Sequence, residues 1–121
     1  MFTISVETHF RASHQLTLPD GSKETSHNHQ WQIKANVSSN RLNNIGIVMN
    51  FHKLKELLDN SVAELDNTAL EKNSYFRQNN PTAENVAKYI YDKLKSELPE
   101  GVKLRSIKVI EAPGCSAKFS E

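Results

Sequence analysis

The sequence is poor in several features that would each assign it to a particular class of protein. Its 121 residues include one cysteine, Cys115, so no disulfide can form within the chain. It has no apolar run near the roughly 20 residues that a membrane-spanning helix needs. Its 15 basic residues nearly balance its 14 acidic residues, and like charges form no block. These absences argue against a disulfide-rich domain, a membrane span and a basic nucleic-acid-binding surface.

The segment MFTISVETHF also lacks the basic start and the apolar stretch of a secretory signal. Together with the single cysteine, this predicts a protein of the cytoplasm. The length suits one domain, which we expect to span residues 1–121, without repeats or low-complexity segments. Any partner is expected to be a small molecule or another protein, and not nucleic acid or a membrane.

Two segments alternate apolar and polar residues with the period of a β-strand. In residues 2–14 the even positions are mostly apolar, and in residues 27–38 the odd positions are. Between them, residues 17–26 contain Pro, Asp, Gly and Ser, which is the composition of a loop. The apolar face of the first strand ends at His14, and that of the second begins with His27 and His29.

The middle of the chain has the spacing of two amphipathic helices. Asn50 is expected to cap the first, and Thr82 the second, which should run through Leu98. Between them, NSYFRQNN predicts a polar loop. Two short strands, 102–111 and 115–120, should follow, joined by the turn APG. The predicted order ββααββ is typical of the α+β class.

The three histidines His14, His27 and His29 form a candidate zinc site. Residues i and i+2 of a strand project from one side about 7 Å apart, so His27 and His29 can converge on one ion. If the two strands form an antiparallel hairpin, His14 lies opposite the start of the second. Catalytic zinc takes three protein ligands and keeps one position open.

The alternative is that each histidine is simply a polar residue at a strand end. Burying imidazoles without partners would cost on the order of 1–3 kcal/mol each, which favours a shared metal ion. His9 and His52 lie off the apolar faces, and we expect them at the surface.

Several motifs resemble those of the 6-pyruvoyl-tetrahydropterin synthase and 6-carboxy-tetrahydropterin synthase family. The family patterns are F-x-A-x-H, H-G-H, G-x-V-x-D-F-x-x-L-K and L-D-H-x-x-L. The corresponding segments here are FRASH (10–14), HNH (27–29), GIVMNFHKLK (46–55) and LDNTAL (65–70), followed by PTAEN (81–85) and a late strand that ends at Glu111. These motifs occur in the family order over nearly the whole chain.

The resemblance implies a tunnelling fold, a four-stranded antiparallel sheet with two helices on one face, assembled as a homohexamer of two stacked trimers with sites between subunits. It implies that His14, His27 and His29 bind Zn²⁺, which would hold the side chain of a pterin substrate and act as a Lewis acid. It implies that Glu111 anchors the pterin ring through two parallel N–H bonds to its carboxylate.

The sequence departs from the family at residues that carry the reaction. Lys23 stands where most members have a catalytic cysteine, and Cys115 lies in the last strand, where a small buried residue is expected. Asp66 is kept from the family's Asp-His dyad, but Asn67 replaces the histidine and cannot shuttle protons near neutral pH. Asn28 and Asn50 replace a family glycine and a family aspartate.

Glu24 offers a replacement for the cysteine, because it stands three residues before His27. A branch of the family known from malaria parasites and some bacteria has this E-x-x-H spacing and cleaves the side chain of 7,8-dihydroneopterin triphosphate. The resulting hypothesis is a zinc-dependent pterin lyase or aldolase that uses Glu24 and Asp66 for proton transfer. The alternatives are a zinc-retaining pterin- or purine-binding protein without activity, the queuosine-pathway reaction to 6-carboxy-tetrahydropterin, and a structural module without metal.

Overall fold

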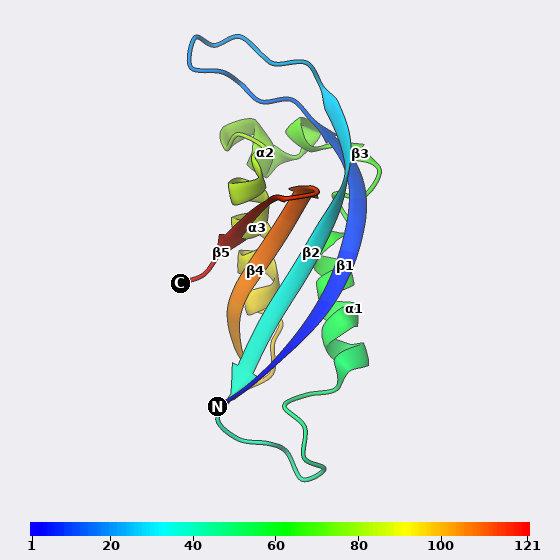
Figure 1. The fold of residues 1–121 in the computed structure, drawn as a ribbon, viewed down its shortest axis with the longest axis vertical. Coiled ribbons are helices and arrows are strands. Elements are labelled where there is room, and N and C mark those ends of the chain that lie inside the picture. Colours follow the sequence, from blue (N-terminus) through cyan, green and yellow to red (C-terminus); the bar gives the residue numbers. More distant parts are fainter.

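The computed structural model describes residues 1–121, in which one β-sheet is backed by helices (Figure 1). The strands are β1 (Phe2–His14), β2 (His27–Ser39), β3 (Thr68–Ala69), β4 (Lys103–Ala112) and β5 (Cys115–Phe119). The helices are α1 (Phe51–Val62), α2 (Ser74–Gln78) and α3 (Ala83–Lys95), with a 3₁₀ turn, η1 (Leu70–Lys72). None of the helices is long and apolar enough to cross a membrane.

β1 and β2 form a long antiparallel hairpin, as their alternation predicts. Every residue from Phe2 to His14 has a register partner between His27 and Ser39. Burial follows the pattern in the sequence, since Val6, Phe10 and Ala12 are buried while their odd-numbered neighbours are largely exposed. One face of the hairpin therefore forms a wall of the core, and the other face is polar.

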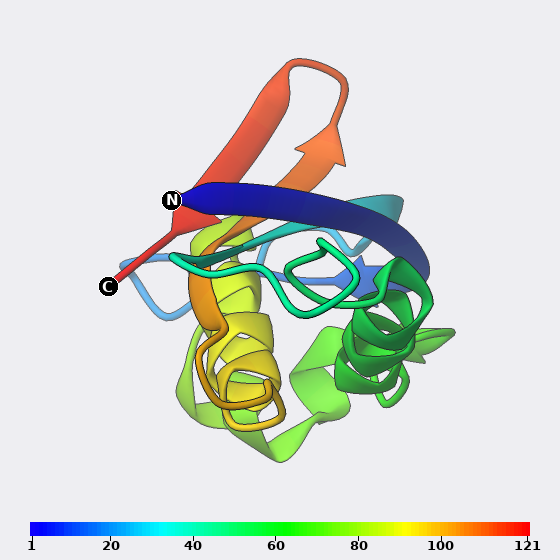
Figure 2. The same ribbon diagram turned by 90° about the horizontal axis from the view of Figure 1, so that it is seen from below.

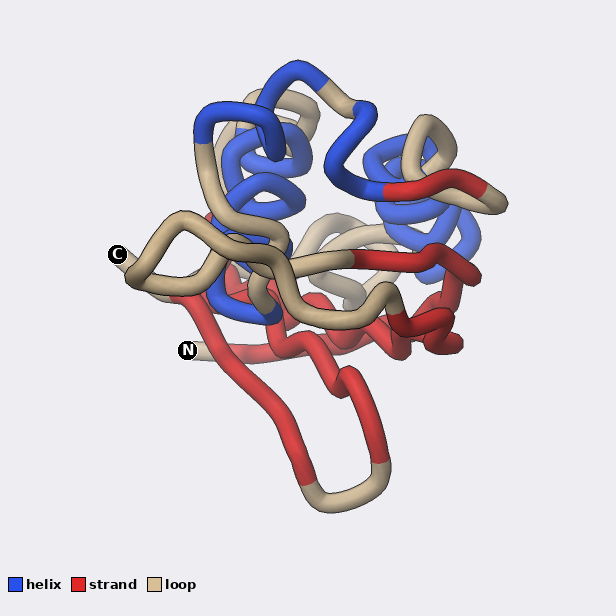
Figure 3. Tube along the Cα trace, turned by 90° about the horizontal axis from the view of Figure 1, so that it is seen from above, coloured by secondary structure: helices blue, strands red, loops and turns tan.

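The sheet has the strand order β3-β1-β2-β4-β5. All neighbours are antiparallel except β3, which pairs in parallel with β1 at Ala12 and Ser13 only. The helices cover one face of the sheet and leave the other face uncovered, and the tip of the β4–β5 hairpin projects away from them (Figure 2 and Figure 3).

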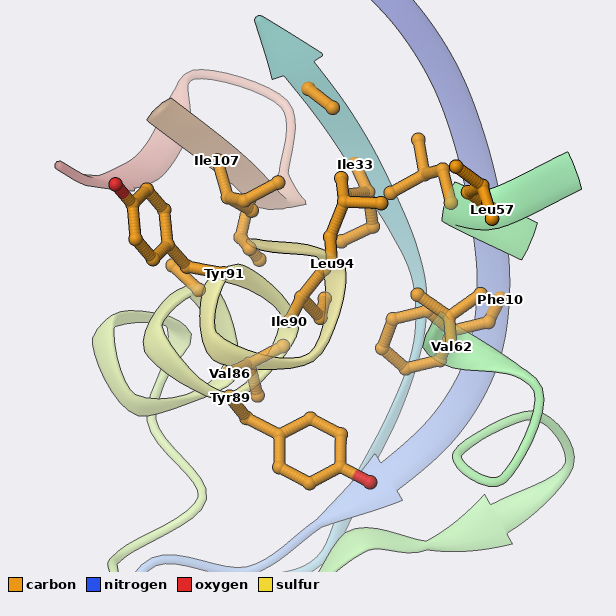
Figure 4. Packing of buried hydrophobic residues seen from close by; sticks show 14 of the residues in the cluster. Phe10, Ile33, Leu57, Val62, Val86, Tyr89, Ile90, Tyr91, Leu94 and Ile107 are labelled. Atoms are coloured by element: carbon orange, nitrogen blue, oxygen red, sulfur yellow. The ribbon is translucent and has the colours of Figure 1, made fainter. Parts of the chain in front are cut away.

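Side chains from both layers meet in one core of 25 buried residues. Phe10, Ile33 and Ile107 enter it from the strands, and Leu57, Val62, Ile90 and Leu94 enter it from α1 and α3 (Figure 4). Both long helices begin at the predicted caps. The Asn50 side chain accepts hydrogen bonds from the backbone of residues 52 and 53, and the Thr82 hydroxyl accepts one from the Asn85 N–H.

The α+β class and the tunnelling fold are confirmed, with two short elements that the sequence pattern did not predict. The segment expected to be a polar loop contains α2, which Asn73 caps and which buries Phe76 in the core. β3 adds a fifth strand at the edge of β1. Helix α3 ends at Lys95, three residues before the predicted Leu98, because Ser96 forms its C-cap.

Candidate metal and substrate site

The hairpin brings the three predicted histidines together. His14 is the register partner of His27, and His29 lies two residues further along β2, opposite Ala12. The ring centroid of His14 lies 6.4 Å from that of His27 and 5.1 Å from that of His29, and the His27 and His29 centroids are 6.0 Å apart. The predicted juxtaposition is confirmed, while the role of these residues as metal ligands stays a prediction.

The three rings differ in their access to solvent. His14 is 3% exposed, His29 is half-buried and His27 is exposed. Buried Trp31 forms the floor, with its ring centroid 4.9 Å from that of His14 and 5.9 Å from that of His29. Its indole N–H is satisfied by the Ala12 carbonyl at 3.1 Å. The cluster is therefore fixed on the core side and open on the side of His27.

The His14 ring is held in one orientation by the backbone. Its Nδ1 lies 2.8 Å from the carbonyl oxygen of Pro81. A carbonyl can only accept, so Nδ1 carries the hydrogen and Nε2 presents its lone pair to the site. Metal-binding histidines commonly have their second nitrogen fixed in this way.

Glu111 faces His14 from β4. Its Oε1 lies 3.0 Å from His14 Nε2, and its side chain is 29% exposed. Because Nδ1 already donates to Pro81, the neutral ring offers only the lone pair of Nε2 to the Glu111 oxygen. Two such acceptor atoms can lie 3.0 Å apart only with a positive centre between them. A proton on Nε2 or a metal ion supplies one.

The ligand atoms of His14, His29 and Glu111 all lie within 4.8 Å of one another. The imidazoles of His14 and His29, with that of His27 at 6.4 and 6.0 Å between ring centroids, form a three-nitrogen donor set that zinc accepts. The donor chemistry thus fits the metal that the sequence predicts. Glu111, predicted as the anchor of a substrate ring, belongs to this compact group, and the exposed His27 lies at its rim.

A cavity of about 550 Å³ opens beside the cluster. It is lined by Asn28, His29, Gln30, Gln32, Ile110, Glu111, Ala112 and Pro113. This volume suits a small organic ligand. The side-chain amides can donate and accept hydrogen bonds, which matches a flat heterocycle with polar edges.

The segment PTAEN supplies a role that sequence reasoning did not assign. Pro81 holds His14 through its carbonyl, Thr82 caps α3, and the Asn85 amide donates to the Asn80 carbonyl at 2.9 Å. Asn80 in turn exchanges two hydrogen bonds with Thr17, at 2.9 and 3.0 Å. The start of α3 and the chain just after His14 are thereby tied together. The sequence shows the PTAEN motif, but no local pattern indicates that Pro81 contacts His14.

Glu24 lies in the loop after β1, which extends past the end of the sheet (Figure 1). Its backbone N–H donates to the Leu16 carbonyl at 3.0 Å, and its Oε1 accepts from the Leu16 N–H at 3.4 Å. The side chain is half-buried and is not part of the group formed by His14, His29 and Glu111. The structure therefore places Glu24 on the loop that precedes His27, facing the loop's own backbone.

Asp66 and Asn67 lie at the edge of β1. The Asp66 carboxylate accepts the Arg11 N–H at 3.0 Å, and the Asn67 N–H donates to the Arg11 carbonyl at 2.6 Å. Asn67 has a φ of +59°, a left-handed conformation that asparagine tolerates better than most residues. This pair fastens the chain beside β1, and Asp66 also lies outside the histidine cluster.

Two further expectations have different outcomes. Cys115 is exposed, so the prediction of a small buried residue was wrong. The reason is that it directly follows the β4–β5 turn, at the projecting tip. His9 and His52 are both exposed, as predicted.

Comparison with known proteins identifies the family of this chain. The model of the family described as 6-pyruvoyl tetrahydropterin synthase matches residues 3–121. The chain is 33% identical over 102 residues to dihydroneopterin monophosphate aldolase of Pyrococcus furiosus, covering 84% of this chain and 82% of that protein. It is 33% identical over 124 residues to 6-carboxy-5,6,7,8-tetrahydropterin synthase of Synechocystis sp., covering 98% and 93%.

A solved structure shares the fold of this chain. The solved structure of Caenorhabditis elegans 6-pyruvoyl tetrahydropterin synthase superposes with a TM-score of 0.87 at 24% identity, covering 99% of this chain and 95% of that one. With a family model that spans almost every residue and relatives of one-third identity over most of their length, the chain belongs to the 6-pyruvoyl tetrahydropterin synthase family.

Proposed function

We propose that this protein is a zinc-dependent lyase that acts on the side chain of 7,8-dihydroneopterin triphosphate or a related pterin, breaking a carbon–carbon or carbon–oxygen bond. The observation that carries the proposal is the convergence of His14, His29 and Glu111, with His27 at the rim, beside a cavity of about 550 Å³. Membership in the family and similarity to an aldolase of the monophosphate support it.

His14, His27 and His29 would hold the zinc ion. The exposed His27 is free to turn toward the other two rings, since its centroid lies only 6.0 Å from that of His29. When bound, the ion supplies Lewis-acid stabilisation of negative charge on a substrate oxygen. The Pro81 carbonyl keeps His14 Nε2 available for it.

Glu111 would anchor the pterin ring. A carboxylate accepts two parallel N–H bonds from the amino group and the adjacent ring nitrogen, as it does from a guanidinium group. Glu111 lines the cavity and is partly exposed, so a ligand can reach it. Binding the ring requires the carboxylate to exchange its contact with His14 for these two donors.

Glu24 and Asp66 would move protons. Cleavage between the first two side-chain carbons needs a base that removes the proton of the hydroxyl on the second carbon. It also needs an acid that returns a proton to the first carbon, which keeps the bonding electrons. The Glu24 side chain accepts one long hydrogen bond, from the Leu16 N–H, and only one oxygen of Asp66 accepts from Arg11. Both carboxylates thus retain a free oxygen.

We also propose that copies of the chain assemble as a homohexamer of two stacked trimers, in the cytoplasm. The sheet has two open edges, because β3 covers β1 only at Ala12 and Ser13 and nothing pairs with the outer edge of β5. Unpaired strand edges are templates for pairing with another chain. Sedimentation equilibrium measures the number of copies, and a monomer at micromolar concentration would contradict this part of the proposal.

Product analysis tests the activity. The zinc-loaded protein is incubated with 7,8-dihydroneopterin triphosphate or monophosphate, and products are identified by mass spectrometry. We expect a pterin with a shortened or rearranged side chain, and no product with Glu24→Gln, although this variant keeps its zinc. Glu97→Gln, the same change at an exposed position outside the cavity, is the matched control.

A second candidate is a zinc-retaining pterin-binding protein without activity. The residues Lys23 and Asn67, in place of the family's cysteine and histidine, favour it. Binding of dihydroneopterin without turnover, unaffected by Glu24→Gln, would support this alternative and overturn the lyase.

A further inference from the structure

Three lysines stand in one row across the uncovered face of the sheet. The register pairs Glu7 with Lys34, Lys34 with Lys108, and Lys108 with Lys118. Register partners project from the same face of a sheet. Their neighbours along the strands, such as Ile33 and Val109, are buried in the core, so the row lies on the opposite face of the sheet. Figure 2 shows that no helix covers that face.

The row has an excess of positive charge. Glu7 ends the row and can neutralise at most its neighbour Lys34. Neither Lys108 nor Lys118 has a carboxylate as a register partner, and none of the three lysines takes part in an ion pair. Like charges directly opposite each other on neighbouring strands oppose folding. This arrangement is therefore unfavourable unless an anion occupies the row.

The adjacent rows on the same face provide hydrogen-bond donors and no carboxylate. On one side lie His9, Gln32, Ile110 and Ser116, and on the other lie Ser5, Asn36 and Ser106. Asn36 and Ser106 already share a hydrogen bond of 3.0 Å. An anion over Lys108 and Lys118 would have these rows on both sides, and the one carboxylate of the lysine row, Glu7, lies at its far end beside Lys34.

We propose that Lys34, Lys108 and Lys118 form a binding site for an oligophosphate. Strands are spaced about 4.8 Å apart, so the three lysine stems span about 10 Å in a straight line. A chain of linked phosphates carries negative oxygens along its length and matches a row of ammonium groups, whereas a single carboxylate meets only one of them. Lysine donates charge-assisted hydrogen bonds to phosphate oxygens.

The row is continuous with the cavity beside the histidines. Gln32 and Ile110 line the cavity and are register partners. They lie two residues along their strands from Lys34 and Lys108, on the same face of the sheet. Successive residues on one face of a strand lie about 7 Å apart. A phosphorylated pterin anchored in the cavity can thus lay its phosphate tail on the lysines. This source of the oligophosphate rests on the proposed function, and free inorganic oligophosphate is the other source.

Isothermal titration of the full chain, as purified, with inorganic triphosphate at low ionic strength tests the site. We expect binding by the wild type, weakened about tenfold or more by the double change Lys108→Gln and Lys118→Gln, and weakened by added salt. Lys72→Gln removes the same charge from an exposed position elsewhere and should leave the affinity within about twofold.

A second arm separates the two sources. If the row holds the substrate tail, the double variant weakens binding of dihydroneopterin triphosphate but leaves binding of unphosphorylated dihydroneopterin unchanged. If the row holds only free oligophosphate, both pterins bind the variant and the wild type equally. Absence of any pterin turnover would overturn the proposed function but would leave the titration with inorganic triphosphate as it stands.

Three results would overturn the lysine site. One is no binding of inorganic triphosphate by the wild type. Another is loss of affinity in Lys23→Gln but not in the double variant, which would locate the anion in the loop cavity that Lys23 shares with Arg77. The third is a double variant that changes sedimentation but not anion affinity. Thermal unfolding is followed in parallel, and removing the repulsion should maintain or raise the melting temperature at low salt.

Discussion

His14 donates its Nδ1 hydrogen to the carbonyl of Pro81 across a distance of 2.8 Å, although the two residues are 67 positions apart in the sequence. This bond joins the end of β1 to the residue before the α3 cap. It fixes which nitrogen of a buried histidine faces the site, so the site is prepared for a metal ion or a proton before any ligand arrives.

The histidine cluster is expected to stabilise the fold through zinc. A ligand that binds only the native state adds RT ln(1 + [L]/Kd), about 2.7 kcal/mol at 100 times Kd. Zinc should raise the melting temperature of the wild type, and a chelator should lower it. His29→Ala should abolish the response, whereas His9→Ala, on the uncovered face, should keep it. Equal responses of the two variants would disprove the assignment of His29.

Glu111→Gln should separate ring binding from metal binding. The amide keeps the shape of the side chain but places an N–H₂ group where the ring donors need an acceptor. We expect dihydroneopterin binding to weaken about tenfold or more while the zinc-dependent rise in melting temperature persists. Fluorescence titration measures the first and thermal unfolding the second. Glu97→Gln, at an exposed position on the other side of the core, is the charge-matched control.

Asn50→Ala should destabilise the protein by about 1 kcal/mol, because the side chain accepts from two backbone N–H groups at the start of α1. Asn50→Asp keeps the acceptor and adds negative charge at a helix start that has no acidic residue in its first turn, so it should be at least as stable as the wild type. Urea unfolding measures both. An alanine variant as stable as the aspartate variant would show that the cap contributes nothing.

Tyr91 should make the fold sensitive to alkali. Burial raises the pKa of its phenol above the ordinary 10.0, and the hydroxyl donates to the Leu104 carbonyl at 3.1 Å. The unfolded chain therefore loses this proton first. The stabilisation is complete below a pH of about 10 and declines as the pH rises toward the folded-state pKa.

The matching variant is Tyr91→Phe. At pH 8 it should be less stable than the wild type by about 0.5–1.5 kcal/mol, because the Leu104 carbonyl loses its partner. Above a pH of about 10 the difference should narrow, since phenylalanine does not titrate. Urea unfolding at the two pH values measures the change, and a constant difference would contradict the role of the phenol.

The elements that the sequence predicted best are those fixed by local chemistry. The alternation in β1 and β2 gave their bounds and buried faces, and Asn50 and Thr82 gave the helix starts. Helix α2 was missed because it is only five residues long within a largely polar segment, and the Asn73 cap and the burial of Phe76 are what stabilise it. Tertiary packing overrides the loop-like composition there.

The site could be predicted in part for the same reason. His14 and His27 are register partners in a hairpin whose two strands the alternation predicts, so their proximity could be predicted from the sequence. The contacts of Pro81 and of Glu111 with His14 join segments far apart in the chain, and no local pattern encodes them. Glu24 and Asp66 belong to a loop and an edge, where side-chain direction depends on neighbours that periodicity does not describe.

Glu111 has no register partner on either neighbouring strand, because the β2 pairing ends at Ile110 and the β5 pairing skips from Ile110 to Ala112. At a bulge of this kind, the direction of a side chain depends on how many residues the strand contains up to that point, whatever their identity. Deleting one residue near the tip of this hairpin would therefore turn the Glu111 carboxylate away from the histidines, although Glu111 and the histidines themselves would be unchanged. The number of residues between 110 and 115 therefore matters to the position of this carboxylate as much as the identity of Glu111 does.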